Sequence, residues 1–112
     1  EADAQDLIGF RLSSRTRTEV RKVVRREEIP EVEVDLLLND KIAIEVKFNS
    51  QYKDGLDQLL ILRDLYGLYP ALIHITKGFS AREVEALRRI SKIEGFPIFI
   101  VHLKRKEVFC LG

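Results

Sequence analysis

Residues 32–48 read VEVDLLLNDKIAIEVKF, and this stretch predicts two short strands joined by a turn at Asn39-Asp40-Lys41. Three polar side chains, Asp35, Glu45 and Lys47, interrupt the otherwise apolar runs. Side chains alternate between the two faces of a strand, so the pairing register decides which of these residues meet.

Only one simple register separates the polar from the apolar residues. A two-residue loop would set Asp35 opposite Ile44 and would mix charge into both faces. A three-residue loop, or a two-residue loop with a bulge, makes one face wholly apolar, with the pairs Leu38–Ile42, Leu36–Ile44 and Val34–Val46. The other face then carries the pairs Leu37–Ala43, Asp35–Glu45 and Glu33–Lys47.

This register places two carboxylates face to face. Directly opposed side chains have Cβ atoms roughly 4.5–5.5 Å apart, so Asp35 and Glu45 repel unless a cation lies between them. Mg²⁺ takes oxygen ligands at about 2.0–2.1 Å. The alternative is a cross-strand charge pair on a solvated face, with Lys47 opposite Glu33. Helices expected to cover this face favour the cation site, because a buried carboxylate pair needs compensation.

Length and composition predict one globular domain over residues 1–112, since 46% hydrophobic and 33% charged residues exclude a disordered chain. A single cysteine, Cys110, excludes an internal disulfide and indicates a reducing, cytoplasmic compartment. No apolar run approaches the roughly 20 residues that span a bilayer, so we expect no membrane association. The chain starts at Glu1 without Met, which is compatible with a domain of a longer protein.

Basic residues concentrate between positions 11 and 26, where seven basic residues accompany one acid, Glu19. The cluster is either a solvated face or a surface that contacts phosphates, which arginine does well through paired hydrogen bonds. On the second interpretation the candidate nucleic-acid-binding residues are Arg15, Arg17, Arg21 and Arg25.

Hydrophobic periodicity predicts the remaining elements. Residues 2–12 have helical spacing, whereas 16–28 fit either a helix or a strand, and we favour a strand because the hairpin needs a third neighbour. Helices are predicted from Asp54 to Gly67 and, with a capping box, from Ser80 to Gly95. Strands are predicted at 71–76, 97–103 and 107–111. His74 and His102 fall in apolar strand runs and are interpreted as core or strand-end residues.

The spacing of these features resembles the PD-(D/E)XK nuclease superfamily, which includes archaeal Holliday-junction resolvases, Mrr-like restriction enzymes and RecB-like nucleases. The resemblance covers residues 1–76 and consists of Asp35, a nine-residue gap, Glu45-Val46-Lys47, an acidic helix before them and a helix with Gln58 after them. Leu62 stands where RecB-like members have tyrosine, which favours the resolvase-like and Mrr-like groups. The fold implied is α/β, with a restriction-endonuclease-like αβββαβ core, a mixed sheet flanked by helices, and a C-terminal helix and β-hairpin.

The resemblance also implies roles for individual residues. Asp35, Glu45 and the Val46 carbonyl would bind Mg²⁺ or Mn²⁺, and Lys47 would orient the attacking water or help to deprotonate it. Gln58, at the start of the next helix, would be a positioning residue near the site. The acid that the first helix contributes in this superfamily has four candidates here: Glu1, Asp3, Asp6 and Glu19.

The resemblance implies a magnesium-dependent endonuclease that hydrolyses phosphodiester bonds in DNA, RNA not excluded, in repair, recombination or defence. The alternative is a catalytically silent nucleic-acid-binding or dimerisation module of the same fold. A homodimer and further domains of a longer chain are the partners considered.

Overall fold

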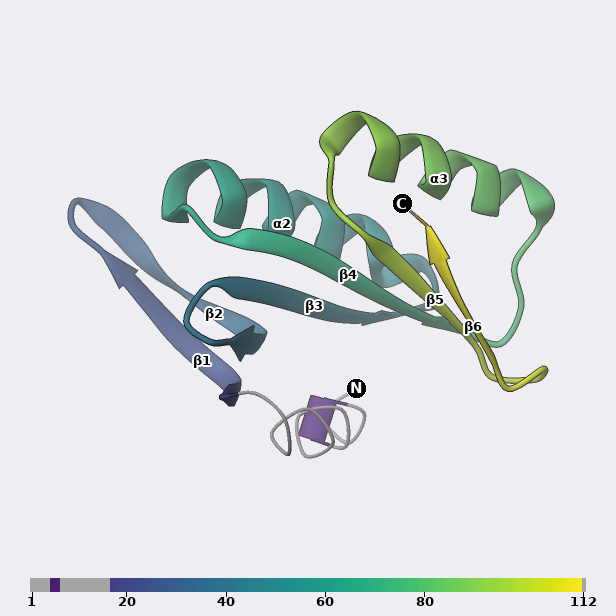
Figure 1. Cartoon of the computed structure of the whole chain (residues 1–112), viewed down its shortest axis with the longest axis horizontal. Coiled ribbons are helices and arrows are strands. Elements are labelled where there is room, and N and C mark those ends of the chain that lie inside the picture. The colour runs from purple at the N-terminus through teal and green to yellow at the C-terminus, as the bar shows by residue number, and fades with distance from the viewer. Residues whose placement is uncertain (1–4, 7–16, 112) are drawn as a thin grey trace.

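The computed structural model describes residues 5–6 and 17–111, which form one six-stranded sheet with two helices packed on it (Figure 1). In chain order the elements are β1 (Thr18–Arg26), β2 (Ile29–Leu38), β3 (Ile42–Phe48), the 3₁₀ turn η1 (Asn49–Gln51), α2 (Tyr52–Tyr66), β4 (Tyr69–Thr76), α3 (Ala81–Glu94), β5 (Ile98–His102) and β6 (Glu107–Leu111). The predicted order of strands and helices from β1 onward is confirmed. Residues 16–28 fitted either a helix or a strand, and the favoured strand is the one observed, as β1.

The strands lie side by side in chain order, from β1 to β6. The β3–β4 and β4–β5 pairs are parallel and the other pairs antiparallel, so the predicted mixed sheet is confirmed. Because both parallel crossovers step in the same direction across the sheet, crossovers of the same hand place α2 and α3 on one face. Both helices share one core cluster with the sheet (Figure 1).

Helices were predicted to flank the sheet. The two helices that are fully described, α2 and α3, both lie on the same face of it. Of the predicted helix at 2–12, only Gln5 and Asp6 are described, and both are helical. The rest of that prediction lies outside the described residues. No helix in the described part of the chain is long and apolar enough to cross a membrane.

Local chemistry explains where the elements begin and end. Asn39 and Asp40 both have positive φ, and the Lys41 N–H donates to the Leu38 carbonyl, which closes the turn between β2 and β3. Ser80 caps α3 in the predicted capping box with Glu83, and left-handed glycines end both helices, at Gly67 and Gly95.

The predicted register of the central hairpin is confirmed only near its turn. The structure pairs Leu36 with Ile44, Leu37 with Ala43 and Leu38 with Ile42, and the backbone pairing of β2 with β3 ends there. We call the point beyond Leu36 and Ile44, where the two strands separate, the fork. The predicted backbone pairs at 33–35 with 45–47 are wrong.

The face alternation of β2 also changes at the fork. Leu36 packs with Val46 on the face away from the helices, as predicted, but Val34 packs with Leu59 and Leu62 of α2. The prediction that Val34 shares a face with Leu36 is therefore wrong. The side-chain alternation of β2 therefore changes between Val34 and Leu36, on either side of Asp35.

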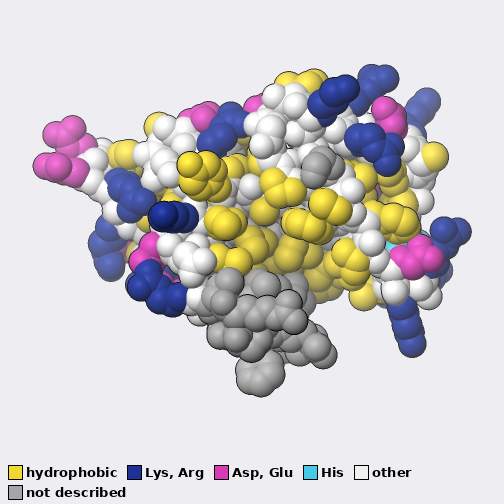
Figure 2. All heavy atoms as spheres, viewed as in Figure 1, with side chains coloured by type: hydrophobic (Ala, Val, Ile, Leu, Met, Phe, Trp, Pro, Cys, Tyr) yellow, Lys and Arg dark blue, Asp and Glu magenta, His cyan; other side chains and the backbone are white. Residues whose placement is uncertain are grey.

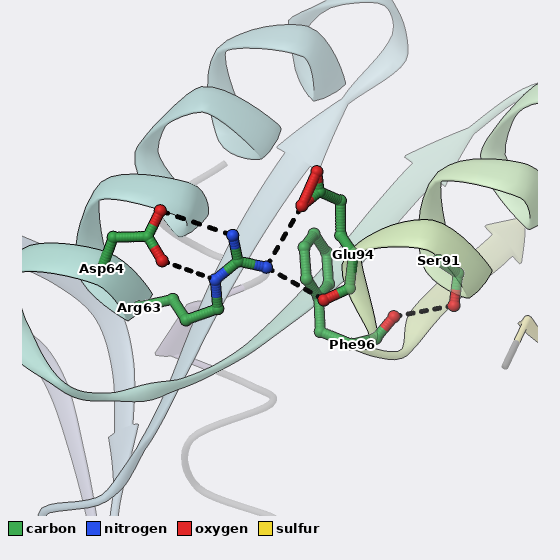
Figure 3. Close-up of polar contacts among 5 residues, drawn as sticks. All are labelled: Arg63, Asp64, Ser91, Glu94 and Phe96. Carbon is green, nitrogen blue, oxygen red and sulfur yellow. Dashed lines mark hydrogen bonds and ion pairs between the residues drawn. The ribbon is translucent and has the colours of Figure 1, made fainter.

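Polar contacts hold α2 and α3 together at one end (Figure 3). The Arg63 guanidinium on α2 contacts the adjacent Asp64 and donates to the carbonyl and carboxylate of Glu94, at the end of α3. Ser91, which is buried, contacts the carbonyls of Phe96 and Leu111 with its hydroxyl at 2.7 Å. These contacts hold the end of α3 against α2 and against β6.

Candidate metal centre

Two buried carboxylates occupy the fork between β2 and β3. Asp35 is 9% exposed and Glu45 is 2% exposed. The Glu45 Oε2 atom accepts the Asp35 N–H at 3.0 Å, and the Asp35 Oδ2 atom accepts the Val46 N–H at 2.8 Å. Each side chain thus takes the place of a backbone acceptor on its own strand, so the carboxylates bridge the strands where the ladder has ended. The predicted meeting of Asp35 and Glu45 is confirmed, although the contact differs from a simple cross-strand pair.

The electrostatics of this pair are unfavourable without a cation. The pKa of Glu45 is raised from 4.5 to about 7, first because the carboxyl group is buried and second because the Asp35 carboxylate lies beside it. The Asp35 N–H and the charge of Lys47 act against this rise. A positive charge placed between the two carboxylates would stabilise both ionised groups and so oppose both causes.

Lys47 extends from β3 toward α2, where a glycine leaves room for it. A Cβ atom on Gly55 would lie 2.7 Å from Lys47 Cγ and 3.0 Å from Leu72 Cδ1. Glycine inside a helix costs about 1 kcal/mol relative to alanine. Because Gly55 has no Cβ atom, the first turn of α2 can pack closely over the aliphatic part of the Lys47 side chain. This packing fixes the direction in which Lys47 leaves the strand.

Replacing Gly55 with Ala is expected to reduce any cleavage activity at least about tenfold, since misplacing a reacting group by about 1 Å can cost 10²-fold. The free energy of unfolding should change by less than about 2 kcal/mol, because the gain in helix propensity opposes overpacking. Initial cleavage rates and thermal melts check both effects. Asp57→Ala, at an exposed position of the same helix, is the control. Unchanged cleavage in the Gly55 variant would show that the lysine position does not matter.

Gln58 lies one turn after Gly55 on α2 and turns toward β2. Its side-chain amide donates to the Glu33 carbonyl at 3.2 Å. This contact ties α2 to the separated part of β2, so Gln58 borders the fork from the helix side. Glu33, whose carbonyl Gln58 contacts, lies two residues before Asp35 on β2. This placement suits a positioning residue.

The candidates for a further acid differ in what the structure describes. Asp6 contacts Arg21 at 2.8 Å, and Arg21 lies on β1 between Val20 and Lys22, the partners of Leu36 and Val34. Glu19 contacts Lys22 at 3.0 Å and lies opposite Leu37. Glu1 and Asp3 lie outside the described residues. Within residues 5–6 and 17–111, no three His, Cys, Asp or Glu side chains form a group that could hold a metal ion.

The predicted nucleic-acid-binding arginines are engaged with carboxylates where they are described. Arg17 pairs with Asp40, Arg21 with Asp6, and Arg25 with Glu31. Arg15 lies outside the described residues. In the view of Figure 2, Lys and Arg side chains lie around the periphery while hydrophobic side chains fill the middle. A phosphate would have to compete with these exposed ion pairs, which are worth about 1 kcal/mol or less each.

Two residues beside the site were not singled out from the sequence as site residues. Gly55 left a signal, since an isolated glycine inside a helical pattern suggests a packing reason. His74, predicted as a core residue, is indeed buried and is the β4 partner of Lys47 in the parallel register. His102 is buried as well. His74 lies beside Lys47 because β3 pairs with β4. Local sequence patterns do not reveal which strands pair.

The donor set fits a hard divalent cation. Mg²⁺ in proteins typically keeps several waters and binds one or two carboxylates together with substrate phosphates. Asp35 and Glu45 supply two carboxylates from opposite strands, in a buried setting that disfavours leaving both charges uncompensated. The chemistry of the donors, rather than a full cage of side chains, makes the fork a candidate metal centre.

Comparison with models of known protein families, with curated proteins and with solved structures finds no match to this chain. The assignment of the centre therefore depends on the residues and geometry described above.

Proposed function

We propose that the chain is a metal-dependent nuclease that hydrolyses phosphodiester bonds in DNA, with a restriction-endonuclease-like core. The observation that carries this proposal is the buried Asp35–Glu45 pair at the fork, with Lys47 two residues beyond Glu45 on the same strand. Buried like charges are costly to a fold. A site that binds a cation and a polyanion gives this arrangement a use.

Each residue has a role that its position suits. Asp35 and Glu45 hold Mg²⁺ or Mn²⁺, and the Val46 carbonyl, next to Glu45 on β3, is the proposed third protein ligand. A bound divalent cation supplies Lewis-acid chemistry, which activates water and offsets charge at the phosphate. Lys47 orients the attacking water and offsets the negative charge that develops on the phosphate. Gln58 keeps α2 and β2 in place around them.

A catalytically silent nucleic-acid-binding or dimerisation module is the second candidate. It is favoured by the lack of a third acidic ligand in the described part of the chain. The two candidates differ in whether Asp35 binds a cation, because a silent module has no need of one.

Calorimetric titration with Mn²⁺ at pH 8 tests the metal centre without any substrate. We expect saturable binding in the wild-type chain and an affinity at least about tenfold lower in Asp35→Asn, because one of two carboxylate ligands is neutralised. Asp40→Asn in the nearby exposed turn is the matched control and should bind as the wild type does. Equal affinities in all three proteins would remove the metal centre from the fork.

A further inference from the structure

A small cavity lies on the helix-covered face of the sheet, and one of its lining residues, His74, is the strand partner of Lys47. Its volume is about 220 Å³, and it lies where η1 and the first turn of α2 meet β4 and the start of α3. Its floor contains His74, which is 1% exposed, and its wall contains Tyr52. Asn49 and Glu83, both exposed, line its rim.

His74 is the unusual member of this lining. Its Nδ1 atom is buried, and no group among the described residues forms a hydrogen bond with it. A buried polar atom without a partner costs about 1–3 kcal/mol. Burial lowers the pKa of His74, while the carboxylate of Glu83 opposes this shift. The imidazole at pH 7 is therefore neutral and offers one N–H and one acceptor nitrogen.

The cavity lies beside the residues that would handle the phosphate. Lys47 and His74 are register partners on β3 and β4, and neighbouring strands are about 4.8 Å apart. Asp35 lies on the other side of β3. A nucleotide next to a phosphate at the fork therefore reaches the cavity by one short step across the sheet.

The lining selects among ligands. A divalent cation finds a single carboxylate here, that of Glu83, and a phosphate meets this carboxylate as well as the ammonium group of Lys53. A nucleobase combines a flat aromatic face with an edge of donors and acceptors. Tyr52, whose ring makes an edge contact with His74 at 4.9 Å between centroids, supplies an aromatic wall, and His74 and Asn49 supply edge partners. The volume lies below the 300–1,000 Å³ of drug-sized pockets, which limits the ligand to one base.

We propose that this cavity binds one unpaired nucleobase of the substrate, beside the phosphate that is cut. This inference rests on the proposed nuclease function and narrows its substrate class. Taking a base out of a duplex costs a few kcal/mol and costs least where the base is already unpaired. Substrates with a single-stranded nucleotide at the cut, such as single strands, flaps and junctions, are therefore preferred over continuous duplex.

The test uses a ten-nucleotide single strand with 2-aminopurine at one central position, titrated with the full chain in EDTA. The fluorescence changes on binding, and the affinity falls roughly tenfold in Tyr52→Ala, as expected for the loss of a stacking contact. His74→Leu and Asn49→Gly give the same direction of change. The asparagine variant removes an exposed side chain at a positive φ of 49°, where glycine introduces no strain. His102→Leu, at another buried histidine, binds as the wild type does.

Unchanged affinity in Tyr52→Ala, His74→Leu and Asn49→Gly overturns the inference, and it does so even if the protein cleaves DNA. Thermal melts of each variant accompany the titrations, and His74→Leu should melt no lower than the wild type because it removes an unpartnered buried polar atom. A base signal that the cavity variants abolish, in a protein that cleaves no DNA, supports the cavity and overturns the nuclease proposal. The two failures are thus distinguishable.

Discussion

Replacing Lys47 with Ala is expected to reduce metal-dependent cleavage by about 10³-fold, while binding of Mn²⁺ and of DNA is retained. Positioned acid–base and electrostatic groups contribute about 10²–10⁴-fold in enzymes. Lys47 is half-buried, and Gly55 makes room for its stem, so alanine removes a held charge rather than a freely moving one. Single-turnover cleavage at saturating metal measures the effect.

The Lys47 variant also changes the electrostatics of its neighbour. The charge of Lys47 lowers the pKa of Glu45, so its removal should raise that pKa, while it also removes a positive charge that repels an incoming cation. Lys41→Ala, at an exposed turn position before β3, is the control for loss of a lysine. Cleavage at wild-type rates in the Lys47 variant would remove this residue from the proposed mechanism.

Replacing Glu45 with Gln is expected to stabilise the metal-free protein at pH 8 while abolishing its response to metal. The rise in the pKa of Glu45 from 4.5 to about 7 corresponds to roughly 3 kcal/mol. Because the folded-state pKa is the higher one, this contribution to stability is fully present below pH 4.5 and is lost as the pH rises through about 7. At pH 8 the wild type therefore carries the full cost of the ionised carboxylate, which Gln avoids.

Chemical denaturation with EDTA present measures this difference across pH 4.5 to 8. The free energy of unfolding of the wild type should fall over this range by more than that of the Glu45 variant. Saturating Mn²⁺ should restore stability to the wild type alone, because a ligand stabilises only the state that binds it. Parallel stability curves for the two proteins would contradict the buried, strained carboxylate pair.

The sequence predicted the meeting of Asp35 and Glu45 because alternation of polar and apolar residues constrains a hairpin register. The same rule failed one residue further, at Val34, because it assumes a continuous backbone ladder. At the fork the two carboxylates accept hydrogen bonds that backbone carbonyls accept in a regular ladder. An alternating pattern of polar and apolar residues cannot predict where this happens. The local exception to the rule coincides with the candidate metal centre.

Other parts of the site depend on contacts between distant segments. The closeness of His74 to Lys47 follows from the order of parallel strands, and the ion pairs of Arg17 and Arg21 follow from packing between segments. No spacing in the sequence predicts these contacts. Gly55 is the exception, since a glycine inside an amphipathic helix pattern is readable as a close approach once its neighbour is known.

The most direct test of the proposed nuclease is cleavage of four labelled DNAs: a single strand, a duplex, a flap and a four-way junction. Each is incubated with the wild type or with Asp35→Ala, in Mg²⁺, Mn²⁺ or EDTA. The account predicts cleavage that needs the metal, is lost in the variant, and is faster for the DNAs with unpaired bases than for the duplex. A folded wild-type protein that cuts none of the four in either metal would contradict it, and would favour the silent binding module.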